Sequence, residues 1–313
     1  MTDERYDVVI IGGGPAGTRT ASAVSGRGLS TLLLEKRVEI GLPVRCAEGV
    51  GPADAVERLI EPDDAWISSR VDGISIVSPD GRRYDKGIEG GGYVLDRHRF
   101  DSALARRAAE NGAEIRTGHQ ATGLSLENGN VTGVTVLDLA GGRRYSVSSG
   151  LTVGADGVES LSPRWAGLRN ASGPSSMFSC AQYLVEGIGL RSSFAEFHLG
   201  SRIAPGGYAW VFPKGDSSAN VGVGIDPMRA GGTTAEGYLE RFIGSRCPGA
   251  KRARFVAGGT LTGRSLPLLS TGGYLCVGEA ANQNNPFTGG GILESLTAAD
   301  IASEVIIEAF EAG

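Results

Sequence analysis

The first clear hydrophobic run of the chain is Val8–Ile11, in which every residue is β-branched. An uninterrupted run of this kind is typical of a central parallel strand that is covered on both faces. Glycines follow the run, and a helix is predicted from Ala16 to about Ser25. A second apolar run, 31–34, ends in the acidic Glu35. The order strand, glycine turn, helix, strand predicts a βαβ unit at the start of the chain.

The next part of the chain predicts a hairpin. Two strands are expected at 71–77 and 82–85, on either side of the turn residues 79–81. The glycines 90–92 do not follow a predicted strand. We therefore expect them to form a flexible connection to a short strand at 93–95.

A helix and a meander are predicted after this hairpin. Asp96 is expected to cap a helix that runs to Glu110, where Asn111-Gly112 ends it. Beyond it, a strand at 113–116 and an antiparallel three-stranded meander, inserted in the parallel sheet, are expected. The meander strands are predicted at 122–127, 131–137 and 144–147. Residues 151–153 are predicted to form a separate strand that returns to the parallel sheet.

The middle of the chain, 178–225, is rich in β signals that favour antiparallel pairing. Tyr208–Pro213 and Asn220–Ile225 both alternate, the first with aromatic residues and the second with glycines. Large rings that face glycines suit a sheet that walls an apolar pocket, although ordinary sheet packing explains the same pattern. A buried strand at 274–277 and a long helix from 292 to about 310 then return to the pattern of the first unit.

Gly12, Gly14 and Gly17 give the spacing G-x-G-x-x-G between the predicted strand and the predicted helix. In dinucleotide-binding folds the first glycine allows a tight turn, the second lets a pyrophosphate approach, and the third lets the helix pack on the strand. Glu35 follows at about the 20-residue interval expected for an acid that binds the ribose 2′-hydroxyl. A glycine-rich turn in another kind of α/β protein is the alternative.

Further candidate residues follow the predicted strands. Cys46 lies beside Arg45 in a loop after the second strand, where ligands bind in nucleotide-binding folds. Such a thiol is a candidate reactive or cofactor-contacting group, and a small buried filler is the alternative. Arg97 and Arg99 oppose the dipole of their predicted helix, so either an anionic partner or solvent accounts for them. Asp156 and its glycine neighbours place polar groups at the same edge of the sheet.

Composition limits the classes of function. The 313-residue chain carries a net charge of −5 and a sequence pI near 5.4, which argues against a nucleic-acid-binding surface. No apolar run reaches the ~18 residues of a membrane span, and the polar N-terminus does not resemble a signal peptide. We therefore expect a cytoplasmic protein, with contact to a membrane surface left open. The four cysteines lack C-x-x-C spacing and nearby histidines, so neither a metal site nor a disulfide framework is expected.

Four motifs occur in a fixed order along the chain. They are the glycine fingerprint with Glu35, then Asp96-Arg97-x-x-Phe100-Asp101, Gly154-Ala155-Asp156-Gly157 and Gly278-Glu279-Ala280-Ala281. This order resembles that of FAD-dependent oxidoreductases of the para-hydroxybenzoate hydroxylase type. Within that group, Pro43–Gly49 (PVRCAEG) and Tyr208–Gly215 (YAWVFPKG) resemble the geranylgeranyl reductase family, which includes the archaeal digeranylgeranylglycerophospholipid reductases. The likeness covers nearly the whole chain.

The resemblance implies an α/β fold. A Rossmann-like FAD-binding domain with a three-stranded β-meander is expected at 1–60, 95–170 and 262–313. An interleaved antiparallel β-sheet domain for the substrate is expected at 61–94 and 171–261. FAD is the implied cofactor, and the residues implied to bind it are Gly12, Gly14, Ala16, Gly17, Glu35, Cys46, Ala47, Gly49, Arg97, Ala121, Asp156, Glu279, Gly291 and Ile292.

The resemblance also implies individual roles. Ala16 would meet the pyrophosphate, and the backbone of Ala121 would meet the adenine end of the cofactor. Tyr208 and Trp210 would line a tunnel for the lipid substrate. Cys46 is the candidate proton donor or flavin gate.

The chain departs from the family pattern in three places. Ala47 stands where glycine usually follows the cysteine, and Glu279 stands where aspartate is usual. The chain also ends soon after the helix predicted at 292–310, whereas family members usually carry a further helical segment that closes the substrate tunnel. We therefore expect either an open or shared pocket or a shortened chain.

The implied reaction is the reduction of isolated C=C bonds in geranylgeranyl chains of an archaeal membrane glycerophospholipid. An unactivated alkene has no carbonyl to accept negative charge. The chemistry therefore needs a proton for one carbon, a hydride from reduced flavin for the more substituted carbon, and a dry pocket. No second glycine fingerprint lies between a strand and a helix, so the electrons are expected from ferredoxin or from a transiently bound nicotinamide.

Two alternatives to this reaction stay open. The first is another flavin enzyme, an aromatic monooxygenase or a halogenase, although a halogenase should show W-x-W-x-I-P where this chain has Tyr208-x-Trp210-x-Phe212-Pro213. The second is a catalytically silent flavin- or isoprenoid-binding protein. A lipid substrate implies peripheral contact with a membrane, yet no basic amphipathic helix is evident in the sequence.

Overall fold

The computed structural model describes residues 4–168, 177–190 and 193–313, which form two compact units. Unit 1 consists of residues 1–42, 98–171 and 263–313, and unit 2 consists of residues 43–97 and 172–262. Each unit is therefore assembled from segments that are far apart in the sequence. Residues 43–60, which we expected in the cofactor domain, belong to unit 2.

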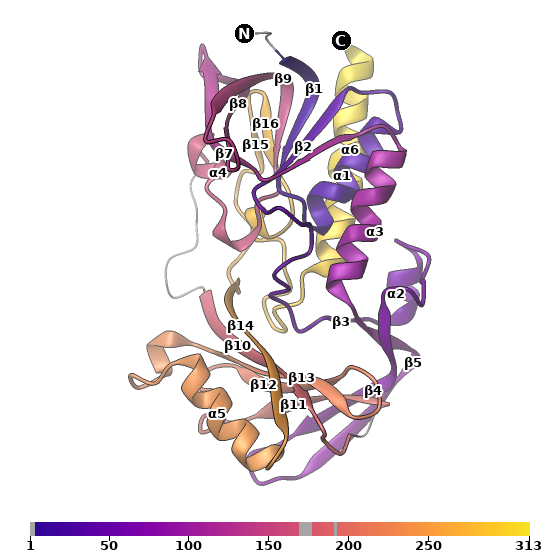
Figure 1. Cartoon of the computed structure of the whole chain (residues 1–313), viewed down its shortest axis with the longest axis vertical. Helices are drawn as coiled ribbons and strands as arrows, with labels where there is room; N and C mark the ends of the chain where they lie inside the picture. The colour runs from indigo at the N-terminus through magenta and orange to yellow at the C-terminus, as the bar shows by residue number, and fades with distance from the viewer. Residues whose placement is uncertain (1–3, 169–176, 191–192) are drawn as a thin grey trace. The chain divides into compact units, whose positions relative to one another are not determined.

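Unit 1 is built on an eight-stranded sheet in which five neighbouring strands run in the order β16-β9-β1-β2-β6 and are parallel (Figure 1). Its strands are β1 (Glu4–Ile11), β2 (Thr31–Glu35), β6 (Glu114–Thr117), β7 (His119–Glu127), β8 (Asn130–Asp138), β9 (Arg144–Gly154), β15 (Ser270–Thr271) and β16 (Tyr274–Cys276). Its helices are α1 (Pro15–Ser25), α3 (Arg97–Glu110), α4 (Ser162–Trp165) and α6 (Ile292–Ala312), with 3-10 turns η1 (Gly157–Glu159) and η4 (Gly278–Ala281).

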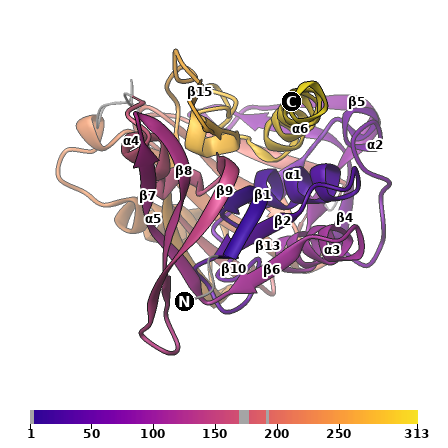
Figure 2. The ribbon, with the colours of Figure 1, turned by 90° about the horizontal axis from the view of Figure 1, so that it is seen from above.

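Both faces of β1 are covered, as the apolar run predicted. Val8 and Ile10 pack with α1 and α6 on one face, and Val9 and Ile11 pack with β8 on the other. Helices α1, α3 and α6 lie on one side of the parallel strands, and β7 and β8 lie on the opposite side (Figure 2). The sequence of a strand that is buried on both faces is a continuous hydrophobic run. The position of β1 could therefore be predicted from the sequence.

Strand β9 differs from the prediction, because we expected two strands where the structure has one. Its first half pairs antiparallel with β8, and it also pairs parallel with β1 over most of its length. Gly150 suggested a break in the sequence. In the structure it is a close-packing position, since a Cβ there would lie 3.1 Å from the ring of Phe310 and 3.0 Å from the carbonyl of Asp7.

Unit 2 is built on a second eight-stranded sheet in the order β14-β10-β13-β12-β11-β4-β5-β3. Its strands are β3 (Gly49–Val50), β4 (Ile67–Val77), β5 (Arg83–Leu95), β10 (Met177–Glu186), β11 (Phe194–Leu199), β12 (Tyr208–Pro213), β13 (Ser218–Ile225) and β14 (Lys251–Leu261). Its helices are α2 (Ala53–Glu57) and α5 (Ala235–Arg246), with a 3-10 turn η3 (Pro227–Arg229). Pairing is antiparallel except between β11 and β4.

Two parts of unit 2 differ from the prediction. The glycines 90–92 are not a flexible connection but lie inside β5, which continues to Leu95. A Cβ on Gly91 would lie 2.3 Å from the carbonyl oxygen of Val71, and the register shifts between Val71 and Gly73. Glycine is therefore required by a bulged close approach of two strands. Strand β14 was not predicted at all, because its first half is exposed and rich in arginine.

The two faces of the unit 2 sheet have different coverings. Helix α5 packs through Leu239 and Ile243 on alternate residues of β10, β12 and β13. The opposite face carries an aromatic cluster that contains Trp210, Phe212 and Phe197. The predicted fold class, a Rossmann-like domain with a meander and an interleaved antiparallel sheet, is confirmed by these two sheets.

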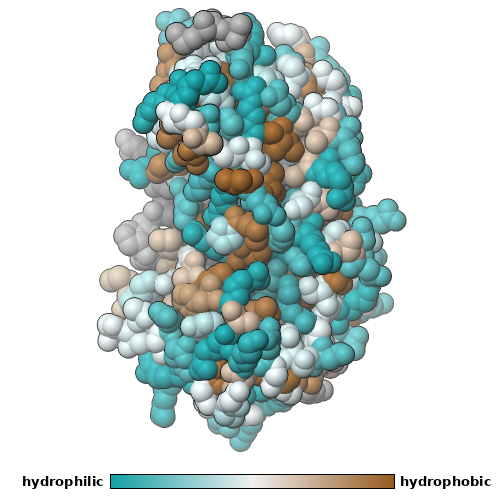
Figure 3. All heavy atoms as spheres, viewed as in Figure 1, coloured by the Kyte–Doolittle hydropathy of each residue, from teal (hydrophilic) through white to brown (hydrophobic). Residues whose placement is uncertain are grey.

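The surface view in Figure 3 shows a face that is mainly hydrophilic, with hydrophobic side chains gathered in patches. Among the helices in the described part of the chain, none has both the length and the apolar composition needed to cross a membrane.

Candidate functional site

The three fingerprint glycines occupy three different environments in unit 1. Gly12 has φ +108°, and a Cβ on it would lie 2.3 Å from the carbonyl oxygen of Ala155. Gly17 packs the helix on the turn, since its Cβ would lie 2.0 Å from the carbonyl oxygen of Gly12. A Cβ on Gly14 would meet no atom within 4 Å, so this glycine keeps space open in front of α1. The close packing of the fold therefore requires glycine at positions 12 and 17 but not at position 14, where the predicted approach of a pyrophosphate stays a prediction.

The N-terminus of α1 is suited to a phosphate group. Gly14 is its N-cap residue and supplies no side-chain hydrogen bond, and Pro15 occupies the first turn. Helix α1 contains no acidic residue in that turn. Backbone N–H groups and the positive end of the helix dipole are therefore available to an anion beside Gly14.

Glu35 lies at the end of β2, where the fingerprint places it. Its carboxylate accepts hydrogen bonds from the backbone N–H groups of Gly13, at 2.7 Å, and Arg37, at 2.8 Å. These contacts hold the acid beside the glycine turn. Its predicted hydrogen bond to a ribose hydroxyl stays a prediction.

The carboxyl ends of the parallel strands bring the first, third and fourth motifs together in unit 1. The backbone N–H of Ala155 donates to Ile11 at 2.8 Å, and that of Val277 donates to Gly154 at 2.9 Å. Gly278, with φ +67°, approaches α1 so closely that its Cβ would lie 2.9 Å from the Cβ of Ala16. This edge of an open parallel sheet is where nucleotide ligands bind.

The remaining predicted cofactor residues of unit 1 lie in different surroundings. The carboxylate of Asp156 accepts hydrogen bonds from Ser160, Leu161 and Ser162, at 2.7 to 3.1 Å, and so fixes the turn before α4. Ala121 is buried, and a register irregularity follows it in β7. Glu279 is partly buried in η4, and the list is completed by Gly291 and Ile292 at the start of α6. Their contacts with FAD stay predictions.

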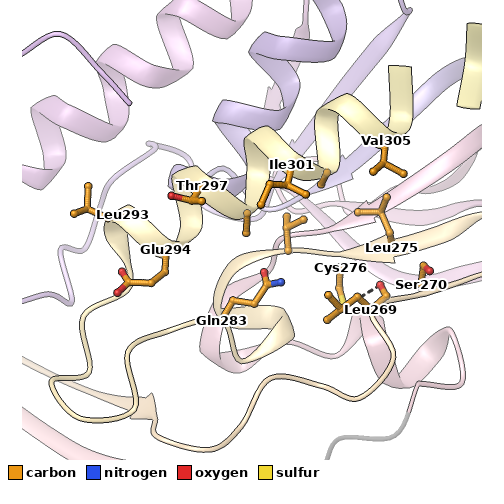
Figure 4. A pocket seen from close by; sticks show the side chains of 13 residues that line it. Leu269, Ser270, Leu275, Cys276, Gln283, Leu293, Glu294, Thr297, Ile301 and Val305 are labelled. Atoms are coloured by element: carbon orange, nitrogen blue, oxygen red, sulfur yellow. Dashed lines mark hydrogen bonds between the residues drawn. The ribbon is translucent and has the colours of Figure 1, made fainter. Parts of the chain in front are cut away.

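A separate cavity in unit 1 lies along α6. Its volume is about 720 Å³, and Figure 4 shows Leu293, Thr297, Ile301 and Val305 of α6 on one side of it and Leu275 of β16 on the other. Of the residues that the structure describes, none of those predicted to bind the cofactor lines this cavity. The space in front of Gly14, rather than this groove, is therefore the candidate phosphate site.

Cys46 lies in the loop 43–49, which belongs to unit 2. Its sulfur accepts a hydrogen bond from the backbone N–H of Glu48 at 3.2 Å. Burial raises the pKa of the Cys46 thiol above its usual 9.0, although Arg97 and the Glu48 N–H act in the opposite direction. Cys46 is therefore a protonated thiol at neutral pH, which suits a proton donor better than a nucleophile.

Glu48 holds this loop and was missed in the sequence analysis. Its carboxylate is 1% exposed and accepts hydrogen bonds from Lys214 Nζ at 2.8 Å, Asn220 Nδ2 at 2.6 Å and the backbone N–H of Arg97 at 2.8 Å. Lys214 also donates to the carbonyl oxygen of Leu95 at 2.7 Å. A glutamate from the PVRCAEG motif and a lysine from the YAWVFPKG motif thus form a buried ion pair within unit 2.

Tyr208 and Trp210 lie on the aromatic face of unit 2, as the alternation predicted. Their rings are 5.9 Å apart in an edge-to-face arrangement. The indole lies over Gly222, where a Cβ would be 2.2 Å from its Cζ2 atom. The pKa of Tyr208 is raised by burial and by the nearby sulfurs of Cys180 and Cys46. The structure therefore places the predicted substrate residues close to the predicted catalytic thiol.

Gln182 of β10 connects these groups, and no pattern in the sequence indicated it. Its Oε1 accepts the indole N–H of Trp210 at 2.9 Å, and its Nε2 donates to the carbonyl oxygen of Cys46 at 3.1 Å. The carbonyl oxygen of Ala47 accepts Asn220 Nδ2 at 3.2 Å. Side chains of the sheet therefore hold the two carbonyl groups that follow the thiol in the chain. Contacts of Cys46, Ala47, Gly49 and Arg97 with FAD stay predictions.

Comparison with protein families gives two matches. Residues 7–78 match an FAD binding domain, and residues 176–261 match the geranylgeranyl reductase catalytic domain. The prediction of FAD as the cofactor is thereby confirmed. The second match covers the unit 2 strands that carry Gln182, Trp210 and Gly222.

Three individual proteins are also similar to this chain over nearly its whole length. A digeranylgeranylglycerophospholipid reductase of Methanosarcina acetivorans is 44% identical over 98% of this chain and 76% of its own length. A crystal structure of a geranylgeranyl bacteriochlorophyll reductase-like protein from Thermoplasma acidophilum has a TM-score of 0.93 at 35% identity, over 99% of this chain and 79% of that chain. A flavin-dependent brominase has a TM-score of 0.82 at 20% identity, over 98% of this chain and 81% of its own, which shows a shared fold alone.

Proposed function

Because this chain belongs to the geranylgeranyl reductase family, we propose that it is an FAD-dependent reductase that saturates the C=C bonds of geranylgeranyl chains on an archaeal glycerophospholipid. The observation that carries this proposal is the grouping of a protonated thiol, Cys46, with the aromatic face formed by Tyr208 and Trp210. An apolar wall beside a proton donor suits an isoprenoid chain, which offers no polar atom to bind.

We assign the binding of the FAD pyrophosphate to the turn of unit 1 that contains Gly14 and the first residues of α1. The open space before Gly14 and the backbone N–H groups of α1 fit a phosphate group. When bound and reduced, FAD supplies the hydride for the alkene.

Cys46 would hold the proton for the second alkene carbon at its sulfur. Because a thiol is a weak acid toward an isolated alkene, Cys46 can release its proton to one alkene carbon only as hydride is delivered to the other. The thiolate left behind faces the Glu48 N–H and the charge of Arg97, both of which stabilise it. A proton from water then restores the thiol.

The aromatic face would position the chain and exclude water. Trp210 is 6% exposed, and its indole N–H is already paired with Gln182, so the indole presents a satisfied apolar surface to the substrate. A dry wall of this kind keeps the thiol protonated and holds the alkene near it. We also propose peripheral contact with the membrane that contains the lipid, because the substrate chains are insoluble in water.

The proposal is tested by offering the reduced, FAD-loaded protein a set of substrates. The mass of the product would be compared for three substrates. They are a digeranylgeranyl glycerophospholipid, free geranylgeraniol, and an aromatic acid supplied with oxygen and nicotinamide. Saturation of the glycerophospholipid is expected, with no change in the aromatic acid. Hydroxylation or halogenation of the aromatic compound with unchanged lipid would contradict the proposal.

A further inference from the structure

A second cavity, in unit 2, lies on the α5 side of the sheet. Its volume is about 330 Å³. Three segments form its walls: the β4–β5 turn with Ser78, the connection after β11 with Arg202, and α5 with Arg241 and Arg246. His198 also lines it and packs edge-to-face on Phe242 of α5 at 4.9 Å. Because residues of a strand alternate between faces, this cavity and the aromatic cluster with Phe197 lie on opposite faces of the sheet.

The lining of this cavity is positively charged. It contains three arginines and, among the described residues, no carboxylate. Asp80, which accepts a hydrogen bond from Ser78 of the lining, is paired with Arg82, and the acid in β11 is Glu196, which is 2% exposed. It is already neutralised by Arg246 at 2.9 Å and Arg83 at 2.9 Å, and it accepts His198 Nε2 at 2.8 Å. Burial raises the pKa of Glu196, but the hydrogen bonds from His198 and Arg246 outweigh it and lower that pKa to about 2.

Two arginines of the lining have no acidic partner. Arg202 makes no hydrogen bond or ion pair with any residue that the structure describes. Arg241 donates from Nε to the carbonyl oxygen of Gly237 at 3.2 Å and lies over the ring of Tyr238 at 4.4 Å, which leaves its two terminal nitrogens without a carboxylate among the described residues. Like charges at one cavity repel each other, so an anion that enters it is stabilised.

Neighbouring arginines on the same unit are paired. Arg82 lies 3.1 Å from Asp80, Arg229 lies 3.1 Å from Asp226, and Arg252 lies 2.9 Å from Glu240. These three arginines are compensated, whereas Arg202 and Arg241 at the cavity are not, although the chain as a whole carries a net charge of −5.

We propose that this cavity binds a phosphate ester. Arginine side chains present parallel N–H groups that match phosphate oxygens, and two of them with free terminal nitrogens suit a group that carries more than one negative charge. The volume leaves room for a small alcohol group attached to the phosphate. The ester is either a soluble molecule or the headgroup of a phospholipid, and the site is independent of the reductase reaction, because it lies on the other face of the sheet.

The test compares a charge-neutralised variant with a matched control. Arg202→Gln/Arg241→Gln removes two unpaired charges from the cavity. Arg144→Gln/Arg254→Gln removes two charges from exposed arginines on β9 and β14 that have no ion pair with the described residues.

All four substituted side chains are exposed, so both variants are expected to fold, and circular dichroism checks their folding. Titration calorimetry with glycerol phosphate and sedimentation with phosphatidic acid vesicles, against vesicles of neutral galactolipid, measure binding to the FAD-loaded protein.

The wild-type protein and the Arg144/Arg254 control are expected to bind, and the Arg202/Arg241 variant is expected to lose at least tenfold in affinity. If the Arg202/Arg241 variant loses binding of glycerol phosphate, a soluble ester is supported. If that variant loses binding only of the phosphatidic acid vesicles, a lipid headgroup is supported. Equal binding by the two variants, or no binding of either probe by the wild-type protein, overturns the proposal. None of these results depends on turnover, so an inactive reductase does not affect them.

Discussion

At the scale of single residues, Glu48 has more polar contacts than its position in the sequence suggested. It follows Cys46 and Ala47 in a loop, with φ +71°, and it receives Lys214, Asn220 and the Arg97 backbone. A glutamate in a glycine-containing loop normally indicates a solvated side chain, so the sequence offered no signal for its burial. The motif that contains Glu48 could be recognised in the sequence. Its side-chain partners, Lys214 after β12 and Asn220 in β13, could not.

Lys214→Met should destabilise the protein strongly. It leaves the Glu48 carboxylate buried without its cation, which typically costs about 3–5 kcal/mol. The control is Lys251→Met, because Lys251 forms an equally short pair with Glu186 but is 75% exposed, and such pairs contribute about 1 kcal/mol or less. Urea unfolding followed by circular dichroism measures both. Equal losses of stability in the two variants would show that the buried pair contributes no more to stability than the exposed pair.

Cys46→Ala should slow lipid reduction by roughly 100-fold or more, the usual contribution of a positioned general acid, with little change in lipid affinity. Cys46→Ser, which keeps a smaller proton donor, should retain part of the activity. Because the pKa of the thiol is raised, the wild-type rate should stay constant through neutral pH and fall only above about 9. Stopped-flow measurement of flavin reoxidation across pH provides the test. Undiminished turnover by Cys46→Ala would remove the thiol from the mechanism.

Gly222→Ala should disturb the aromatic face. Its Cβ would overlap the indole of Trp210, and overpacking of this kind costs about 1–3 kcal/mol. Gly244→Ala on α5 is the matched control, since its Cβ meets nothing within 4 Å and alanine favours a helix by roughly 0.5–1 kcal/mol. The two variants should therefore shift the unfolding midpoint in opposite directions, and a shift of the same sign would contradict the packing described here.

At the scale of secondary-structure elements, the glycine turn between β1 and α1 was predictable in detail. Its three glycines were given separate roles from spacing alone, and Gly12 and Gly17 have the predicted close contacts. The glycines 90–92 were not predictable in the same way. Their role depends on a strand that approaches from residue 71, and a single sequence does not show which distant backbone comes close.

Gly14→Ala and Gly17→Ala should separate cofactor binding from folding. The backbone at Gly14 has φ −77°, which alanine adopts without strain, and its Cβ would enter only the open space before α1. Gly14→Ala should therefore keep the unfolding midpoint of the apoprotein and lose most bound FAD, measured by flavin absorbance. Gly17→Ala should lower the midpoint, because its Cβ would overlap the backbone of Gly12. Full FAD retention by Gly14→Ala would exclude this turn as the pyrophosphate site.

At the scale of the whole molecule, the sequence predicted the alternation of two kinds of sheet but not all of their boundaries. The parallel strands of unit 1 are continuous apolar runs, so their positions followed directly. Residues 43–60 were grouped with unit 1 because they follow its second strand in the chain. In the structure, β3 pairs with β5 instead, through Gly49 and Val94, and this long-range pairing leaves no local pattern.

The measurement that tests the central claim most directly is an anaerobic single turnover. The FAD-loaded protein is reduced with dithionite, a digeranylgeranyl glycerophospholipid is added, and flavin reoxidation is followed together with the mass of the lipid. We predict reoxidation of one flavin for each double bond that gains two hydrogens. Reduced flavin that persists over unchanged lipid, or purified protein that binds no flavin, would contradict the assignment of this chain as a geranylgeranyl lipid reductase.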